Sequence, residues 1–154
     1  RSIANIGLYP GDVDTADING DGRLDLIAVN VRSNDLSLLL GKGDGTFTTL
    51  ARLPTGRAPA GIAIADLDRD GNDDIVVAMR DAPELMIYRN EGGQAPSFRR
   101  AGTVATEGNP IDIASGDFDH DGLPDLIVSV PEAMAFAILL NRSPGAGLAG
   151  RSAN

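Results

Sequence analysis

The sequence contains no cysteine and no tryptophan, and it has a single histidine, His120, among its 154 residues. Without cysteine the chain forms no disulfide and has no thiolate to act as nucleophile or metal ligand. With only one histidine, nucleophilic triads are not available in their usual forms. His120 lies inside an acidic loop at a position that points outward, so we interpret it as a solvated residue and not as a catalytic base. We therefore expect a protein that is not an enzyme.

Aromatic residues and long apolar runs are also scarce. Aromatic side chains make up 4% of the chain, and only Tyr9 and Tyr88 carry a polar ring. Few rings are then available to stack on sugars, which disfavours a lectin-like function. No apolar run approaches the ~20 residues that a membrane-spanning helix needs, so we expect no membrane span. The chain shows no signal peptide and begins at Arg1, and we interpret it as a processed or excised piece.

Acidic residues outnumber basic residues, 22 to 13. The formal net charge is −9 at pH 7, and half of the 22 acidic residues occupy the predicted ligand positions of three short loops. The chain lacks the basic surface that nucleic acid requires, so we expect no nucleic-acid partner. Hydrophobic residues make up 42% of the chain, which is enough for one modest domain with its own core.

One acidic motif is present in three copies. The pattern D-x-[DN]-x-D-G-x-x-D occupies residues 17–25, 66–74 and 117–125, and its copies begin 49 and 51 residues apart. Oxygen side chains at every second position converge on a hard cation when the backbone curls around it, and the glycine permits the sharp turn. A ligand set rich in carboxylates and free of thiols and imidazoles selects calcium over zinc or copper.

Two other interpretations of the motif are weaker. An EF-hand requires a bidentate glutamate at position 12 and flanking helices, but that position holds Ala28, Val77 or Val128 and the flanks are strand-like. Simple acidic turns would not require the motif to recur three times in register. We therefore predict three metal-binding loops.

The motif marks a repeat of about 50 residues, a period in the range of propeller blades. Each repeat divides into four short strands separated by Gly, Pro, Asn and Asp. The first three strands of the repeats are expected at 13–16, 26–29 and 36–40, at 62–65, 75–79 and 85–89, and at 113–116, 126–130 and 136–140. Fourth strands are expected at 47–54 and 98–106. The sequence thus predicts an all-β protein, a β-propeller of four-stranded antiparallel blades with three blades per chain.

The metal loop followed by an Asp-[Leu/Ile] strand, repeated near 50 residues, resembles the FG-GAP or VCBS-type blade of integrin-alpha-like β-propellers. The segment from Leu40 to Phe47 also resembles the G-x-G-D-G-x-F ending of some members. The resemblance spans residues 1–142 as three blades. Residues 143–154, rich in glycine and alanine, are interpreted as a flexible tail or the start of a shared outer strand.

The resemblance implies three calcium ions per chain, each held by four side chains and one backbone carbonyl. The first site would use Asp17, Asn19, Asp21, Asp25 and the Arg23 carbonyl. The second would use Asp66, Asp68, Asp70, Asp74 and the Asn72 carbonyl. The third would use Asp117, Asp119, Asp121, Asp125 and the Leu123 carbonyl. Because Asn19 removes one negative charge, we expect the lowest affinity at the first site.

Three blades are too few to close a ring, since closed propellers have about 4–8. Either two copies of the chain form a six-bladed ring with twofold symmetry, or the chain is a fragment of a larger propeller. The chain starts in the phase of a fourth strand, which suits closure by an N-terminal strand.

We expect a non-catalytic, calcium-binding propeller module for protein or glycan interaction, acting outside the cell, in the periplasm or at the cell surface, where calcium is plentiful. Turns and connections opposite the metal loops would provide the ligand face, because a rigid scaffold lets such loops vary. The candidate residues on that face are Arg32, Asn34, Arg57, Arg80, Asp81, Glu107 and Glu132. Two alternatives remain: a self-assembling structural block without a ligand, and the propeller part of a polysaccharide lyase or hydrolase.

Overall fold

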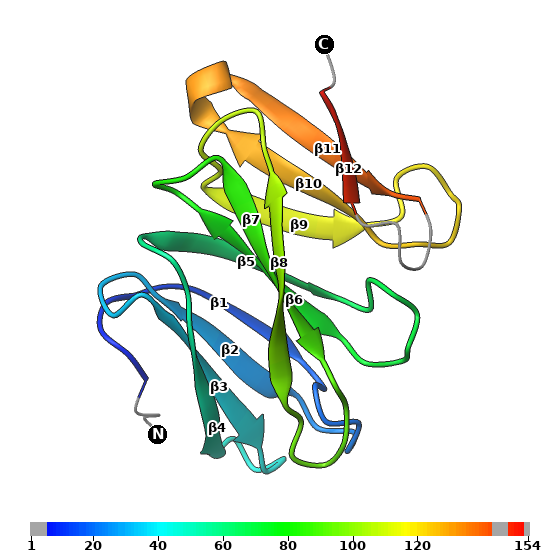
Figure 1. The fold of residues 1–154 in the computed structure, drawn as a ribbon. Coiled ribbons are helices and arrows are strands. Elements are labelled where there is room, and N and C mark those ends of the chain that lie inside the picture. The colour runs from blue at the N-terminus through cyan, green and yellow to red at the C-terminus, as the bar shows by residue number, and fades with distance from the viewer. Residues whose placement is uncertain (1–5, 143–147, 153–154) are drawn as a thin grey trace.

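The computed structural model describes residues 6–142 and 148–152, and these form three four-stranded antiparallel sheets (Figure 1). The first sheet contains β1 (Pro10–Ala16), β2 (Asp25–Asn30), β3 (Asp35–Gly41) and β4 (Phe47–Pro54). The second contains β5 (Pro59–Ala65), β6 (Asp74–Met79), β7 (Glu84–Asn90) and β8 (Phe98–Ala105). The third contains β9 (Asp112–Gly116), β10 (Asp125–Val130), β11 (Ala135–Asn141) and β12 (Leu148–Ser152). One short 3-10 turn, η1 (Pro131–Ala133), joins β10 to β11.

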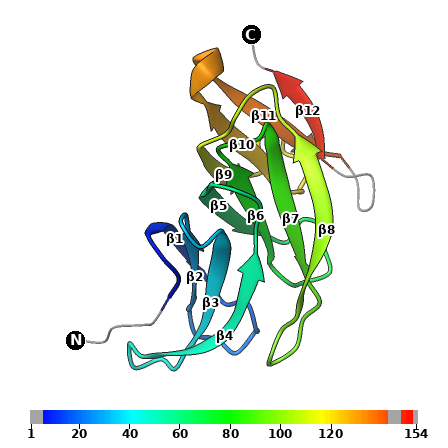
Figure 2. The same cartoon turned by 60° about the vertical axis from the view of Figure 1, so that its left-hand side comes forward.

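Neighbouring strands in each sheet are consecutive in the chain, so each sheet is a series of hairpins. This arrangement confirms the all-β prediction and places every expected strand, with bounds that differ by three residues or fewer from those expected. The three sheets follow one another in space in the order of the chain, with the second between the other two (Figures 1 and 2). They resemble propeller blades, and the described residues form no closed ring.

The second strands of the repeats carry the core between the sheets. All six residues of β6 are buried. Ile75 and Val77 belong to the apolar cluster shared with the first sheet, whereas Val76 and Ala78 belong to the cluster shared with the third. Because successive side chains of a strand point to opposite faces, an uninterrupted β-branched run fits a sheet covered on both sides.

The inner strands approach one another closely. A Cβ added at Gly61 in β5 would lie 2.8 Å from the Cα of Asp112 in β9. Between β1 and β5, Asp12 Oδ2 accepts a hydrogen bond of 3.0 Å from the Ile62 amide. Glycine and alanine are frequent in these strands because larger side chains would not fit between them.

The outer strand of the third sheet comes from the C-terminal part of the chain. Residues 148–152 pair with β11 in antiparallel register, Asn141 opposite Leu148 and Ala137 opposite Ser152. The first five residues, predicted to lie in the phase of a fourth strand, fall outside the described residues, as do residues 143–147 of the predicted tail.

Candidate functional site

The three acidic loops lie at the same end of their sheets, each between a first and a second strand (Figure 1). They connect β1 to β2, β5 to β6 and β9 to β10. The turns between second and third strands lie at the other end, together with the connections between sheets. Antiparallel hairpins produce this separation, and it divides the molecule into a loop end and a turn end.

The last aspartate of each loop is a buried hydrogen-bond acceptor. Asp25 is fully buried, and its Oδ2 accepts from the Ile18 amide at 3.0 Å while its Oδ1 accepts from the Gly41 amide at 2.8 Å. Asp74 and Asp125 repeat both bonds, Asp74 with Leu67 and Asn90, and Asp125 with Phe118 and Asn141. We call these three residues the hub aspartates. Each ties its loop to the end of the third strand.

Burial raises the pKa of Asp25 and of Asp74, and the backbone donors oppose that rise. A buried carboxylate is unfavourable without compensating charge, so a nearby cation would stabilise the ionised form of each hub aspartate.

The glycine at position six of each loop has a positive φ. Gly22, Gly71 and Gly122 have φ values of 82°, 86° and 81°. The Gly22 amide donates to Asp17 Oδ2 at 2.7 Å. The same bond recurs at 2.9 Å between Gly71 and Asp66 and at 3.0 Å between Gly122 and Asp117. Because left-handed backbone favours glycine, the sequence motif directly encodes this turn.

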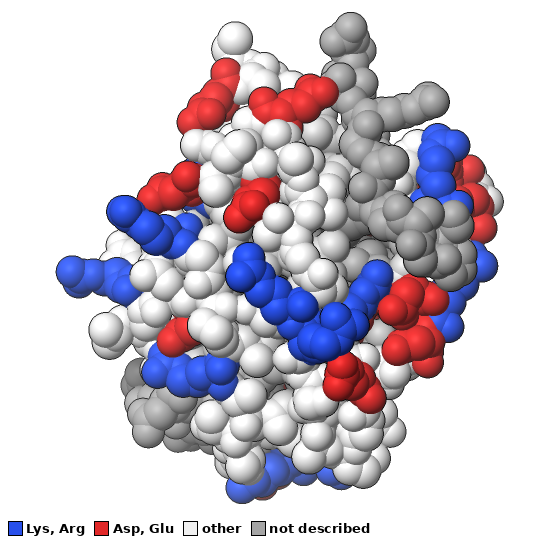
Figure 3. Space-filling model, viewed as in Figure 1, with Lys and Arg blue, Asp and Glu red and all other residues white. Residues whose placement is uncertain are grey.

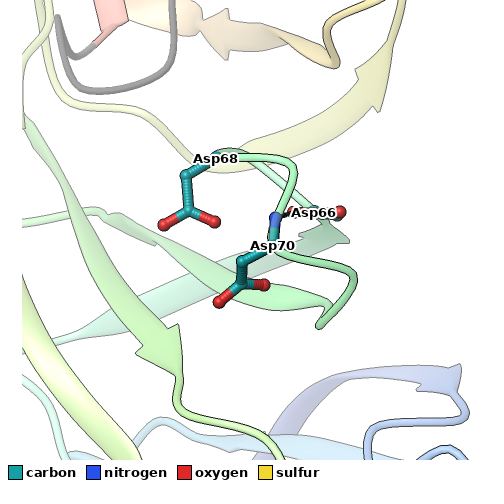
Figure 4. Close-up of side chains that lie close together, drawn as sticks. All are labelled: Asp66, Asp68 and Asp70. Carbon is teal, nitrogen blue, oxygen red and sulfur yellow. Dashed lines mark hydrogen bonds between the residues drawn. The ribbon is translucent and has the colours of Figure 1, made fainter.

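The second loop brings three carboxylates together. Asp66, Asp68 and Asp70 each offer an oxygen, and these atoms all lie within 4.8 Å of one another (Figure 4). Asp68 Oδ1 is buried and has no hydrogen-bond partner. A buried, unsatisfied carboxylate oxygen is costly, and a cation in the loop would satisfy it. The hub aspartate Asp74 lies outside this cluster and contacts the Arg89 guanidinium instead.

The third loop makes a different cluster. Oxygens of Asp117, Asp119 and the hub aspartate Asp125 lie within 4.8 Å of one another. Asp121 is not part of this cluster, and its Oδ1 accepts a hydrogen bond of 2.8 Å from the Leu123 amide.

The first loop has an amide where the others have a second carboxylate. Asn19 donates from Nδ2 to Asp21 Oδ2 at 3.1 Å, and the Arg23 guanidinium lies 2.6 Å from the same oxygen. Although desolvation opposes the change, hydrogen bonds from Asn19 and Arg23 lower the pKa of Asp21. Two donors therefore already engage one of the predicted ligands.

The predicted carbonyl donors at position seven have a common role. The amides of Arg23, Asn72 and Leu123 donate to the position-five carboxylates Asp21, Asp70 and Asp121. These bonds curl each loop, and the use of the carbonyls as metal ligands remains a prediction. The side-chain atoms predicted to bind a metal in the loops are all oxygens, which fits a hard cation such as calcium.

Buried asparagines link neighbouring repeats. Asn90 at the end of β7 donates from Nδ2 to the Ile18 carbonyl of the first loop at 2.9 Å. Asn141 at the end of β11 donates to the Leu67 carbonyl of the second loop at 2.8 Å. The first and second loops are therefore each held by the repeat that follows them. Ile18 and Leu67 are 2% and 3% exposed, but their third-loop counterpart Phe118 is 44% exposed.

Comparison with protein families agrees with this repeated geometry. A model of the FG-GAP-like repeat matches residues 17–77 and 66–128, and a model of the FG-GAP repeat matches residues 109–151. The chain belongs to the FG-GAP repeat family. The resemblance inferred from the acidic loops is thus confirmed.

One similar solved structure is entitled "Crystal structure of BBS1N in complex with ARL6DN, soaked with lead". It is 20% identical to this chain with a TM-score of 0.56, and the match covers 95% of this chain and 44% of that one. At this identity the likeness shows the fold, and the FG-GAP chain spans less than half the length of that neighbour. No curated protein matches the chain. Among the described residues, no helix is long and apolar enough to cross a membrane.

At the turn end, the FG-GAP sheets form two hollows that are open to solvent. One, of about 790 Å³, is lined by Tyr9, Asp12, Arg80, Ile111 and Asp112 among others. The second, of about 520 Å³, brings together Arg57, Asp81, Glu84 and Asn109. Both combine charged groups with apolar walls.

The seven predicted ligand-face residues divide between these hollows and the surrounding surface. Arg80 lines the first hollow, and Arg57 and Asp81 line the second. Glu132 accepts from Asn109 Nδ2 at 3.4 Å, which places it beside the second. Arg32 and Glu107 are exposed and line neither hollow.

Asn34 has a structural role at the turn end. It has φ of 55°, and its Oδ1 accepts from the Ala58 amide at 3.0 Å, which fixes the connection between the first two sheets. The bond uses one of the two lone pairs of the side-chain oxygen and ties Asn34 to the fold. Residue type and position indicated a turn but not this bond.

Sequence reasoning missed several residues. Arg89, Asn90 and Asn141 reach the acidic loops from third strands. Arg89 has leucine at its equivalents, and the asparagine shared by the second and third repeats is replaced by Gly41 in the first. Tyr9 was noted as a polar ring but not as part of a hollow; it is 68% exposed. Tyr88, the other polar ring, is buried and donates to the Pro54 carbonyl.

Proposed function

We propose that this FG-GAP chain is a non-catalytic, calcium-binding β-propeller module that binds a protein or glycan outside the cytosol. One ion in each of the three loops would stabilise the loop end, and the hollows at the turn end would receive the ligand. The observation that carries the proposal is the second loop, where three carboxylates converge and one buried oxygen has no partner.

The donor chemistry supports calcium. Carboxylate and amide oxygens predominate, and each aspartate has lone pairs beyond those used by the loop amides. A hub aspartate would bind the ion with lone pairs not used by its two backbone donors. Loops of this kind, which lack a glutamate at position 12, fit affinities of about 10⁻⁴–10⁻³ M, appropriate to extracellular calcium.

Thermal unfolding in calcium, magnesium and chelator tests the metal function. With 10 mM calcium and a dissociation constant near 0.1 mM, each occupied loop adds about 2.7 kcal/mol to the free energy of unfolding. We expect a clear rise in Tm with calcium and a smaller rise with magnesium, which requires a stricter octahedral geometry. An equal Tm in calcium and chelator would refute the metal function.

The turn end supports the interaction function. The hollow around Tyr9 offers an exposed aromatic ring beside the guanidinium of Arg80 and the carboxylates of Asp12 and Asp112. Concave sites that combine apolar walls with a few charged groups are usual for ligands.

Elsewhere, basic and acidic side chains lie close together on the face over β7 and β8 (Figure 3).

Binding to glycan and protein arrays in calcium tests this second part. Tyr9→Ala and Arg80→Ala should reduce any specific signal, whereas Glu107→Ala, outside both hollows, should not. Equal signals from all three variants would place binding elsewhere. Incubation with polysaccharides should release no products, and depolymerisation would favour the enzyme alternative.

We also propose that the third sheet packs against a further blade. Phe136 is 62% exposed, whereas its counterparts Leu36 and Leu85 are fully buried by the next sheet. The further blade would belong to a second copy of the chain or to a longer parent protein. Light scattering after size exclusion decides between them: a mass of twice 16.0 kDa in calcium supports a six-bladed dimer, and a monomer refutes it.

A further inference from the structure

The second acidic loop contains a cation from its own chain. The guanidinium of Arg89 in β7 contacts the hub aspartate Asp74, and its Nη1 lies 3.3 Å from Asp68 Oδ2. The Arg89 side chain is 22% exposed and that of Asp74 is 1% exposed. Because charges shielded from water interact more strongly, this guanidinium offsets part of the negative charge of the loop.

The other repeats have leucine at the same position, fifteen residues after the hub aspartate: Leu40 and Leu140. Leu40 lines a hollow beside the first loop together with Asn19 and Asp21, so this position lies next to the acidic loop. The ion pairs among the described residues include none with a carboxylate of the third loop. Arg89 therefore distinguishes the second loop from the third, although both have aspartate at all four predicted side-chain ligand positions. Arg69 also contacts the third loop, but it donates to the backbone carbonyl of Asp121 and not to a carboxylate.

Arg89 and a bound metal would share the same carboxylates. One oxygen of Asp68 faces the guanidinium, and the other is buried without a partner. The metal would therefore bind a loop whose charge is already reduced by one. The first loop has its charge reduced in two ways, because the amide of Asn19 replaces a carboxylate and Arg23 pairs with Asp21.

We propose that Arg89 is a built-in counter-cation that weakens calcium binding at the second loop and holds that loop folded when calcium is scarce. The inference rests on the proposed calcium function. Repulsion between a guanidinium and a divalent ion a few ångströms apart, in a largely hydrated loop, weakens binding about tenfold. The third loop, without such a pair, should fill at lower calcium and should lose its order first in chelator.

The experiment follows the three loop glycines by NMR in the intact 16.0 kDa chain. The amides of Gly22, Gly71 and Gly122 each donate to the first aspartate of their loop, so each reports calcium binding at one site. Calcium titrations compare the wild type with Arg89→Leu, which installs the residue of the other two repeats. Arg52→Leu is the control, because it removes an equal charge from an ion pair with Asp35 in the first sheet.

We expect Arg89→Leu to lower the calcium dissociation constant at Gly71 about tenfold while leaving that at Gly122 unchanged. Arg52→Leu should change neither. The reciprocal variant Leu140→Arg should raise the dissociation constant at Gly122. In chelator, Arg89→Leu should lower Tm more than Arg52→Leu, because the carboxylates of the second loop lose their only described cationic partner.

The outcomes separate this inference from the calcium function. If all three glycines respond to calcium but Arg89→Leu leaves the Gly71 constant unchanged, Arg89 is not a counter-cation and the calcium function stands. If no glycine responds in any variant, the calcium function itself is refuted. A Tm of Arg89→Leu in chelator equal to that of Arg52→Leu would also overturn the inference.

Discussion

The second and third repeats have the same motif in different surroundings. The sheet of the second repeat is covered on both faces, its loop is tied to the third repeat by Asn141, and its carboxylates share the Arg89 guanidinium. In the third repeat one face exposes Phe136, and the loop exposes Phe118. The difference shows that the motif encodes the turn of each loop, whereas neighbouring strands determine how much of the loop is buried and how much of its charge is offset.

The largest expected effect concerns the hub aspartates. Replacing Asp74 by Ala removes the acceptor of two buried amides and a partner of Arg89, so we expect a loss of about 3–5 kcal/mol in the free energy of unfolding. Asp125→Ala removes the same two bonds at a more exposed loop and should cost about 2–3 kcal/mol. Chemical denaturation in chelator measures both. If Asp125→Ala lowers the free energy of unfolding as much as Asp74→Ala or more, the greater burial of the second loop does not strengthen these bonds.

A second contrast lies at equivalent positions of the third strands. Leu85→Ala should cost about 3 kcal/mol because it leaves a cavity between two sheets. Phe136→Ala should cost less than about 1 kcal/mol in the isolated chain, because the ring is mostly exposed. Denaturation curves of the two variants test this. Should Phe136→Ala cost as much as Leu85→Ala, another part of the molecule or a second copy covers that face.

The asparagines between repeats provide the next comparison. Asn141→Ala leaves the buried Leu67 carbonyl without its donor, and Asn90→Ala does the same for Ile18, so each should cost about 1–2 kcal/mol. The consequence should be local, so amide exchange should rise in the second loop for Asn141→Ala and in the first for Asn90→Ala. Faster exchange confined to the mutated strand itself would contradict the proposed link between repeats.

The smallest expected effect concerns position four of the loops. Gly20, Arg69 and His120 occupy it with φ of 70°, 61° and 61°. Because a non-glycine residue is strained there, His120→Gly should stabilise the chain by about 0.5–1 kcal/mol, and Gly20→Ala should destabilise it by a similar amount. Tm measurements in calcium test both variants: Tm should rise for His120→Gly and fall for Gly20→Ala. A rise in Tm for Gly20→Ala would refute the proposed strain at position four.

Much of the fold could be predicted from the sequence because its signals are local. The strands follow from β-branched runs between turn residues, and the loop turn follows from glycine at positions such as Gly71. The period of the motif also aligned the repeats. These features depend on residues close in the chain, and three copies reinforce one another.

Features that depend on packing could not be predicted. Arg89 reaches Asp74 from fifteen residues away, and Asn141 reaches Leu67 across 74 residues. Both contacts depend on the relative placement of strands. Arg89 has no counterpart in the other repeats, and the asparagine shared by the second and third repeats is replaced by Gly41 in the first. The motif also could not show that Asp125 joins the carboxylate cluster of its loop while Asp74 pairs with an arginine.

The hairpin order of the sheets has an evolutionary consequence. Each of the three sheets is built from one uninterrupted stretch of sequence, β1–β4, β5–β8 and β9–β12. A duplication of about fifty codons would therefore add a whole blade without changing the strand order or the connections of the neighbouring sheets. A new copy would meet an existing sheet across the interface that the parent repeats already share, so the array could grow or shrink by single units while its loops acquired different charges.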